Sequence, residues 1–154
     1  MKVEPIAPYL EPVRKSITVA RPAAEAFEIF TAGISRWWPL KKFSIGQERA
    51  VRCAVEPFVG GEVYEERDDG ERFPWGRVVT WDPPARLVFT WHPGRDPKTS
   101  QEIEVRFVPD GQKTVVEVEH RGWDRYGADA AEARDGYGKG WETVLKISYA
   151  GACA

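Results

Sequence analysis

Residues 102–107 read Glu-Ile-Glu-Val-Arg-Phe and alternate strictly between charged and apolar side chains. Ile103, Val105 and Phe107 fall on one face of an extended chain, because successive side chains of a strand point to opposite sides. This period is typical of an antiparallel strand with one face on a core and the other in water. The stretch therefore predicts a sheet that is covered on one side only.

The segments around this stretch carry strand signals as well, separated by turn sequences. Gly60-Gly61, Asp69-Gly70 and Asp110-Gly111 supply turn residues between them. Strands joined by such short turns must be antiparallel, because a parallel crossover needs about a dozen residues or more. We expect strands at residues 13–19, 50–55, 62–67, 75–81, 86–91, 102–108 and 114–121.

One or two short helices are expected between the first and second strands. Pro22 suits the first turn of a helix, where its missing N–H is not needed. Phe27 and Phe30 follow at the spacing of one helical face. This segment is expected to end before Pro39, because a residue that precedes proline avoids the helical region.

A long C-terminal helix is expected from the helical period that returns after about residue 128. Gly136, Gly138 and Gly140 precede its apolar stripe. A glycine inside a helix costs about 1 kcal/mol relative to alanine, so three would cost about 3 kcal/mol. We therefore expect the regular helix to begin or kink near residues 139–141. Residues 122–138 would then form a mobile loop that admits a ligand to the interior.

The composition excludes several classes of protein. The chain has 154 residues, enough for one domain, with 22 basic and 24 acidic residues. A net charge of −2 argues against a nucleic-acid partner or an anionic membrane surface. No run of about 18 apolar residues predicts a membrane span. Two cysteines make no disulfide framework, and a cytoplasmic location is expected.

The domain organisation is expected to be simple. Residues 1–12 contain Pro5, Pro8 and Pro12 and are expected to form an extended arm. Residues 13–150 are expected to form a single domain. No phosphate-binding loop, dinucleotide fingerprint, serine-nucleophile elbow or zinc-protease motif occurs. With only two histidines and no cysteine–histidine spacing, neither a metal nor a cofactor is expected.

His120 is the titratable side chain that strand alternation directs inward, on the same face as Val116 and Val118. Its first interpretation is a core histidine that hydrogen-bonds to the backbone. Its second is a polar group inside a ligand cavity, since such cavities are apolar with a few placed polar groups. Catalysis by His120 comes third. It ranks behind the other two because the spacing identifies no partner nucleophile or acid.

Five short motifs follow one another along the chain. They are Gly-Gly-Glu-Val-Tyr at 60–64, Trp-Gly-Arg-Val-Val at 75–79, Pro-Pro-Ala-Arg-Leu-Val-Phe-Thr-Trp at 83–91, Glu-His-Arg-Gly-Trp at 119–123 and Gly-Trp-Glu-Thr-Val-Leu at 140–145. Their order resembles the START-like, or SRPBCC, superfamily, and within it the chain is most similar to the bacterial branch related to the activator of the heat-shock protein 90 ATPase. The resemblance implies an α+β helix-grip fold, in which a curved antiparallel sheet of about seven strands surrounds a long C-terminal helix and leaves a cavity between them.

The aromatic content directs the functional prediction, since the chain has 7 Trp, 7 Phe and 5 Tyr. A tight small core rarely accommodates seven tryptophans, so some should lie partly at the surface, as in a protein-binding module, or line a hollow. We expect a cytoplasmic protein that binds a small apolar or aromatic molecule in that cavity. Two alternatives stay open: a protein-binding module, such as a chaperone cofactor or a regulator's partner, and an enzyme that uses His120 as acid or base. A homodimer is also left open. The residues expected to line the cavity are Trp81, Phe89, Trp91, Phe107, His120, Trp123, Tyr137, Trp141 and Leu145.

Overall fold

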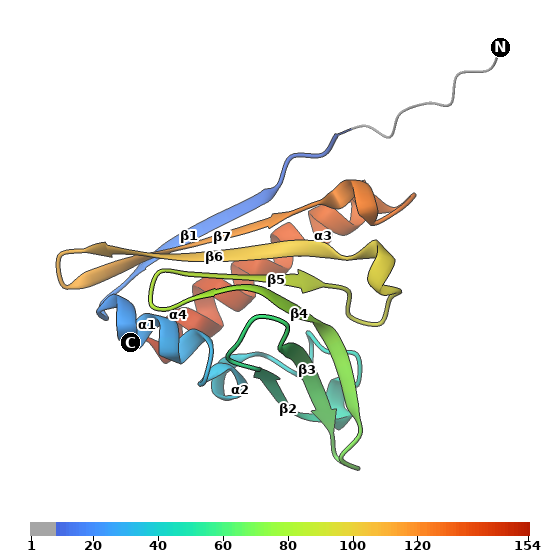
Figure 1. The fold of residues 1–154 in the computed structure, drawn as a ribbon, viewed down its shortest axis with the longest axis horizontal. Coiled ribbons are helices and arrows are strands. Elements are labelled where there is room, and N and C mark those ends of the chain that lie inside the picture. The colour runs from blue at the N-terminus through green and yellow to red at the C-terminus, as the bar shows by residue number, and fades with distance from the viewer. Residues whose placement is uncertain (1–8) are drawn as a thin grey trace.

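The computed structural model describes residues 9–154, so most of the predicted N-terminal arm lies outside the described residues. A seven-stranded antiparallel sheet bends around a C-terminal helix, which runs behind the sheet in Figure 1. This is the helix-grip architecture that the family resemblance implies. The strands are β1 (Val13–Val19), β2 (Ala50–Val55), β3 (Glu62–Arg67), β4 (Arg72–Asp82), β5 (Arg86–Trp91), β6 (Gln101–Asp110) and β7 (Lys113–Arg121). The helices are α1 (Ala23–Phe30), α2 (Ile34–Trp37), α3 (Ala130–Thr143) and α4 (Ala150–Ala152).

The sheet order is β1-β7-β6-β5-β4-β3-β2. Strands β2 to β7 each pair with their neighbour in the sequence, as short connections require. β1 instead pairs with β7, in a register that runs from Val13 opposite His120 to Val19 opposite Thr114. The two edges of the sheet are therefore β1 and β2. The segment between these two strands carries α1 and α2.

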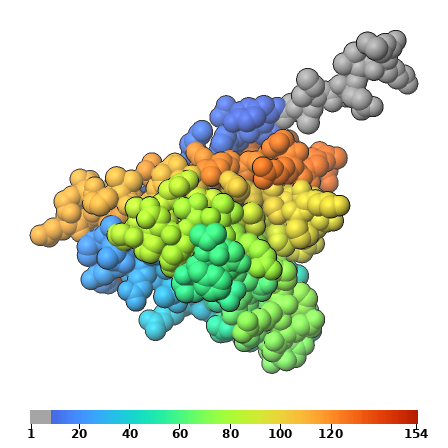
Figure 2. Space-filling view, viewed as in Figure 1, coloured from blue at the N-terminus to red at the C-terminus, as the bar shows by residue number. Residues whose placement is uncertain are grey.

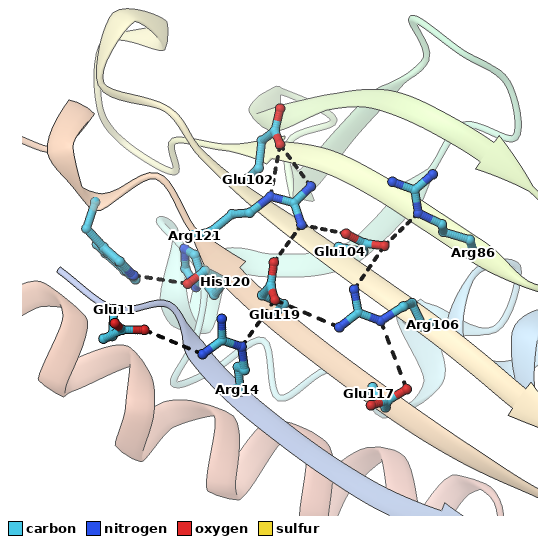
Figure 3. A network of polar contacts seen from close by, with 11 residues as sticks. Glu11, Arg14, Arg86, Glu102, Glu104, Arg106, Glu117, Glu119, His120 and Arg121 are labelled. Atoms are coloured by element: carbon cyan, nitrogen blue, oxygen red, sulfur yellow. Dashed lines mark hydrogen bonds and ion pairs between the residues drawn. The ribbon is translucent and has the colours of Figure 1, made fainter. Parts of the chain in front are cut away.

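The two faces of the sheet differ as the alternation in β6 predicts. Ile103, Val105 and Phe107 are almost completely buried, and Val105 lies opposite Val118 of β7. The opposite face carries charged side chains from β1, β5, β6 and β7, which form an alternating network of arginines and glutamates (Figure 3). One face thus packs on the core, and the other is held together by ion pairs. Figure 2 shows this side of the molecule filled at its centre by the green to yellow segments that include β4 and β5.

The short helices cover one end of the sheet. Phe27 and Phe30 of α1 pack on Phe107 of β6, with ring centroids 5.2 Å and 5.9 Å away. α2 ends at Trp37, and Trp38 is extended before Pro39, as predicted. This reversal brings Trp38 inward, where it is buried.

The prediction that the C-terminal helix begins near residues 139–141 is wrong. α3 begins at Ala130 and runs through Gly136, Gly138 and Gly140. The predicted loop of residues 122–138 is correspondingly shorter: residues 122–129 connect β7 to the helix, and they include a 3-10 turn at Trp123–Arg125.

Tertiary packing explains why three glycines do not interrupt α3, because helix propensity is a weak preference that burial overrides. Trp141 and Leu145 are buried against the sheet. At the other end of α3, the guanidinium of Arg134 donates to the carbonyls of Glu11 and Pro12. Contacts on both sides of the glycines therefore hold the helix.

A π-helical segment, Val144–Tyr149, separates α3 from α4. Tyr149 is completely buried, and its hydroxyl donates to the carbonyl of Ala26 in α1 at 2.7 Å. Its ring also contacts Phe30 and Trp37. The C-terminal helix is thereby joined to both short helices.

Candidate ligand-binding cavity

A cavity of about 530 Å³ opens where α3 approaches the segment after α2 and the loop after β5. We call residues 39–46 the cavity loop. The lining is mostly aromatic, aliphatic or glycine. It comprises Trp38, Lys42, Phe43, Ser44 and Ile45, then Trp91, Pro93 and Gly94, then Tyr126, and from the C-terminal helix Ala133, Gly136, Tyr137, Gly140, Trp141 and Val144.

The helix wall of the cavity is formed by one face of α3. Ala133, Gly136 and Gly140 recur at intervals of three and four residues, so they lie on the same side of the helix. A Cβ at Gly140 would come within 3.4 Å of Phe43, whereas a Cβ at Gly136 would meet no atom within 4 Å. These small residues leave the helix surface bare, so the space beside it stays open.

The cavity loop forms the opposite wall, and Glu65 of β3 holds it in place through hydrogen bonds. The carboxylate of Glu65 is completely buried and accepts hydrogen bonds from the backbone N–H of Ile45 at 2.6 Å and of Gly46 at 2.8 Å. It also accepts one from the indole N–H of Trp75 at 2.7 Å. Three donors thus satisfy a buried carboxylate, which would otherwise carry a large desolvation cost.

Tryptophan rings form the inner end of the cavity. Trp38 lies between Trp91 and Trp141, with ring centroids 5.8 Å and 6.2 Å away, and its indole donates to the carbonyl of Phe43 at 2.7 Å. The indole of Trp91 donates to the hydroxyl of Tyr137 at 3.0 Å. These bonds satisfy the polar edges of the rings, so their faces remain as apolar wall.

His120 lies beneath this wall in a chain of hydrogen bonds. Trp141 Nε1 donates to His120 Nδ1 at 3.2 Å, and His120 Nε2 lies 3.1 Å from Oε1 of Gln101. The amide of Gln101 in turn donates to the carbonyl of Thr99 at 2.8 Å. His120 is completely buried, and this burial lowers its pKa to about 3. The imidazole is therefore neutral at neutral pH and has both nitrogens engaged, which leaves it no free site for acid–base chemistry.

The structure divides the nine residues that the sequence placed at the cavity. Trp91, Tyr137 and Trp141 lie in its lining. The other six pack in the core around it: Trp81 and Phe107 against Phe27 of α1, Phe89 beside Trp91, and His120, Trp123 and Leu145 in the layer between sheet and helix. Strand alternation identifies the inward face but not which inward residues meet a hollow.

Sequence reasoning missed the cavity loop and the glycine face of the helix. Trp38 and Phe43 come from a segment without a regular period, so no pattern marks them. By helix propensity alone, Gly136 and Gly140 indicate a break in the helix. Their spacing of four residues, continued from Ala133, was the signal for one small-residue face.

Six of the seven tryptophans are buried, and Trp81 is half-buried. Trp38, Trp91 and Trp141 line the cavity, as expected for tryptophans around a hollow. The part of the chain that the structure describes has no fully exposed tryptophan of the kind that would favour a protein-binding module. The described residues contain no group of three His, Cys, Asp or Glu side chains that could hold a metal ion. None of the helices in residues 9–154 is long and apolar enough to cross a membrane.

Comparison with known proteins identifies the family. The sequence profile described as Activator of Hsp90 ATPase homolog 1-like protein matches residues 20–147. The chain belongs to this family. Membership confirms the resemblance seen in the five motifs, and a search of the curated proteins found no match.

Three solved structures illustrate the similarity. An anthrahydroquino-gamma-pyrone synthase, Txn09, complexed with SUM, is 41% identical over 80% of this chain and 84% of its own, with a TM-score of 0.57. The self-sacrificing resistance protein CalC from Micromonospora echinospora is 35% identical over 92% of both chains, with a TM-score of 0.64. A Bacillus halodurans protein is 15% identical over 95% of this chain and 99% of its own, with a TM-score of 0.69, and so shares the fold alone.

Proposed function

We propose that this protein is a cytoplasmic binding protein for a small planar aromatic molecule, held in the cavity between the cavity loop and α3. The observation that carries the proposal is the pairing of two surfaces. Tryptophan faces of Trp38, Trp91 and Trp141 form the inner wall, and the bare helix face at Gly136 and Gly140 lies beside them. Aromatic rings stack well on such walls, and most small-molecule sites are apolar hollows of this size.

The relatives support an aromatic ligand. One is named as the synthase of an anthrahydroquino-gamma-pyrone, which is an aromatic product, and another as a resistance protein. Both align over four fifths of this chain or more. We infer binding rather than synthesis, because His120 has no free nitrogen and the described lining contains no Asp, Glu, His or Cys side chain.

The experiment is a titration with 2-naphthoate, anthraquinone-2-carboxylate and anthraquinone-2-carboxamide, followed by tryptophan fluorescence and by the melting temperature. Three tryptophans line the cavity, so a bound ring should change their emission. A ligand at 100 times its Kd stabilises the folded state by about 2.7 kcal/mol. For a chain of this length that is a rise in Tm of roughly 5–10 °C. If none of the three probes changes emission or Tm at millimolar concentration, the proposal is wrong.

A further inference from the structure

The polar groups of the cavity are few, and they differ between its mouth and its interior. Among the described lining residues, Lys42 alone carries a charge, and it is an exposed residue of the cavity loop. Ser44 is engaged within that loop, since its hydroxyl donates to the carbonyl of Leu40 at 2.5 Å and accepts from the N–H of Gln47 at 2.8 Å. The two remaining polar side chains of the lining are Tyr126 and Tyr137.

Tyr137 presents an unused hydrogen-bond donor. Its oxygen accepts from the indole of Trp91 at 3.0 Å, and within residues 9–154 its hydroxyl hydrogen has no acceptor. Burial raises the pKa of Tyr137, so the hydroxyl keeps its proton at neutral pH. A ligand oxygen in the cavity would complete the hydrogen bonding of this group, which favours ligands that carry a carbonyl or ether oxygen on the ring.

The mouth of the cavity is positively charged. Lys42 forms no ion pair with any described residue. Arg95 follows Gly94 of the lining and contacts another lining residue: its guanidinium stacks 3.8 Å above the ring of Tyr126 and donates to the Tyr126 carbonyl at 2.7 Å. No described acidic side chain belongs to the lining. Lys42 in the lining and Arg95 beside it are both cations, and no carboxylate of the lining offsets their charge. They should therefore attract an anionic ligand and repel a cationic one.

We propose that the cavity selects aromatic acids: the ring lies between the tryptophans, a ring oxygen accepts from Tyr137, and an acidic group lies at Lys42. This inference rests on the proposed function and gives it a ligand class. An aromatic cage without charge could also bind a quaternary ammonium through cation–π contacts. In this protein the positive charges of Lys42 and Arg95 disfavour such a cation and favour an anionic ligand.

The test is calorimetric titration at low salt with two matched pairs of probes. Anthraquinone-2-carboxylate and its carboxamide differ in charge, whereas anthraquinone-2-carboxylate and anthracene-2-carboxylate differ in the ring oxygens. An exposed ion pair corresponds to about a fivefold preference for the carboxylate over the carboxamide. A neutral hydrogen bond corresponds to about a tenfold preference for the quinone over the anthracene. Both preferences are expected for the unmodified protein.

Variants assign each preference to a residue. Lys42→Gln should abolish the preference for the carboxylate, whereas Lys41→Gln, an exposed neighbour outside the lining, should keep it. Tyr137→Phe should abolish only the preference for the quinone. If Tyr137→Phe does not fold, the comparison of quinone with anthracene in the unmodified protein still decides the point.

The outcomes separate this inference from the proposed function. Equal binding of all three probes would overturn the ligand class and leave aromatic binding intact. Tighter binding of a cationic ring, such as N-methylacridinium, would also overturn it. Failure of every probe to bind would overturn both proposals.

Discussion

The indole N–H of Trp141 donates to Nδ1 of His120 across 3.2 Å, and this contact fixes the role of both residues. Because Nδ1 accepts, Nε2 carries the proton and donates to Gln101. The ring of Trp141 is thereby held in the cavity wall from behind. His120, for which the sequence offers catalysis only as a third interpretation, supports the wall.

The buried imidazole makes stability depend on pH. The folded protein binds no proton at His120 until the pH falls to about 3, whereas the unfolded chain binds one near 6.5. His120 therefore removes stability as the pH falls below 6.5. Between pH 7 and pH 5 this contribution is about 2 kcal/mol. Urea unfolding at the two pH values should show this loss for the unmodified protein and a smaller loss for His120→Gln. Parallel pH profiles would contradict it.

The cavity loop depends on the carboxylate of Glu65. In Glu65→Gln an amide NH₂ replaces one oxygen and meets a backbone N–H that needs an acceptor. We expect a loss of about 2–3 kcal/mol in the free energy of unfolding. Hydrogen exchange at Ile45 and Gly46 should become faster.

Glu66→Gln is the matched control for that variant. Glu66 is the next residue and pairs with Arg52 and Arg72 nearer the surface. Its loss should cost much less than that of Glu65→Gln, because exposed ion pairs contribute little to stability, and it should leave exchange in the cavity loop unchanged. Equal effects of the two variants would show that Glu65 does not fix the loop.

The outer face of the sheet depends on one glutamate more than on its neighbours. Glu104 is buried, and its carboxylate forms ion pairs with the guanidinium groups of Arg86 at 2.6 Å, Arg106 at 3.2 Å and also Arg121 (Figure 3). Burial alone would raise the pKa of Glu104, but hydrogen bonds from Arg121 and Arg86 outweigh it and lower the pKa to about 2. Glu104→Gln should therefore destabilise the protein by about 2–3 kcal/mol at pH 7.

The effect of Glu104→Gln should shrink as the pH falls from about 4.5 towards 2. Over this range the unfolded chain binds a proton at Glu104 and the folded protein does not, so the stability that the carboxylate contributes is progressively lost. Glu117→Gln on the same face is the control. Glu117 is 41% exposed and lies 4.0 Å from Arg106, so its loss should cost less than about 0.5 kcal/mol. A cost as large as that of Glu104→Gln would contradict this account.

The strands could be predicted because their period is fixed by the chain itself. Residues 13–19, 50–55, 62–67 and 86–91 are strands with the predicted bounds. In β6 the alternation of Ile103 and Val105 also identified the buried face. Turn residues then determined the antiparallel order, because short connections permit no other.

The C-terminal helix and the cavity could not be predicted in the same way. Gly136 and Gly140 lower the local preference for a helix. Whether the helix forms is decided by contacts with residues far away in the sequence, and the local pattern does not reveal these contacts. The cavity loop takes its shape from Glu65, which lies 20 residues away from Ile45. Such long-range contacts have no periodic signal.

The most direct test of the account is a pair of glycine substitutions in α3. Gly136 lies in the cavity lining with open space beyond it, and Gly138 lies outside that lining with no atom within 4 Å of an added Cβ. Leucine at either position should stabilise the helix by up to about 1 kcal/mol. Only Gly136→Leu places a side chain in the cavity.

Titration of both variants with anthraquinone-2-carboxylate separates a binding cavity from a mere gap between helix and loop. The account predicts that Gly138→Leu binds the probe with the affinity of the unmodified protein and that Gly136→Leu loses binding at least tenfold, about 1.4 kcal/mol. Equal affinity of the two variants would contradict a ligand site beside Gly136.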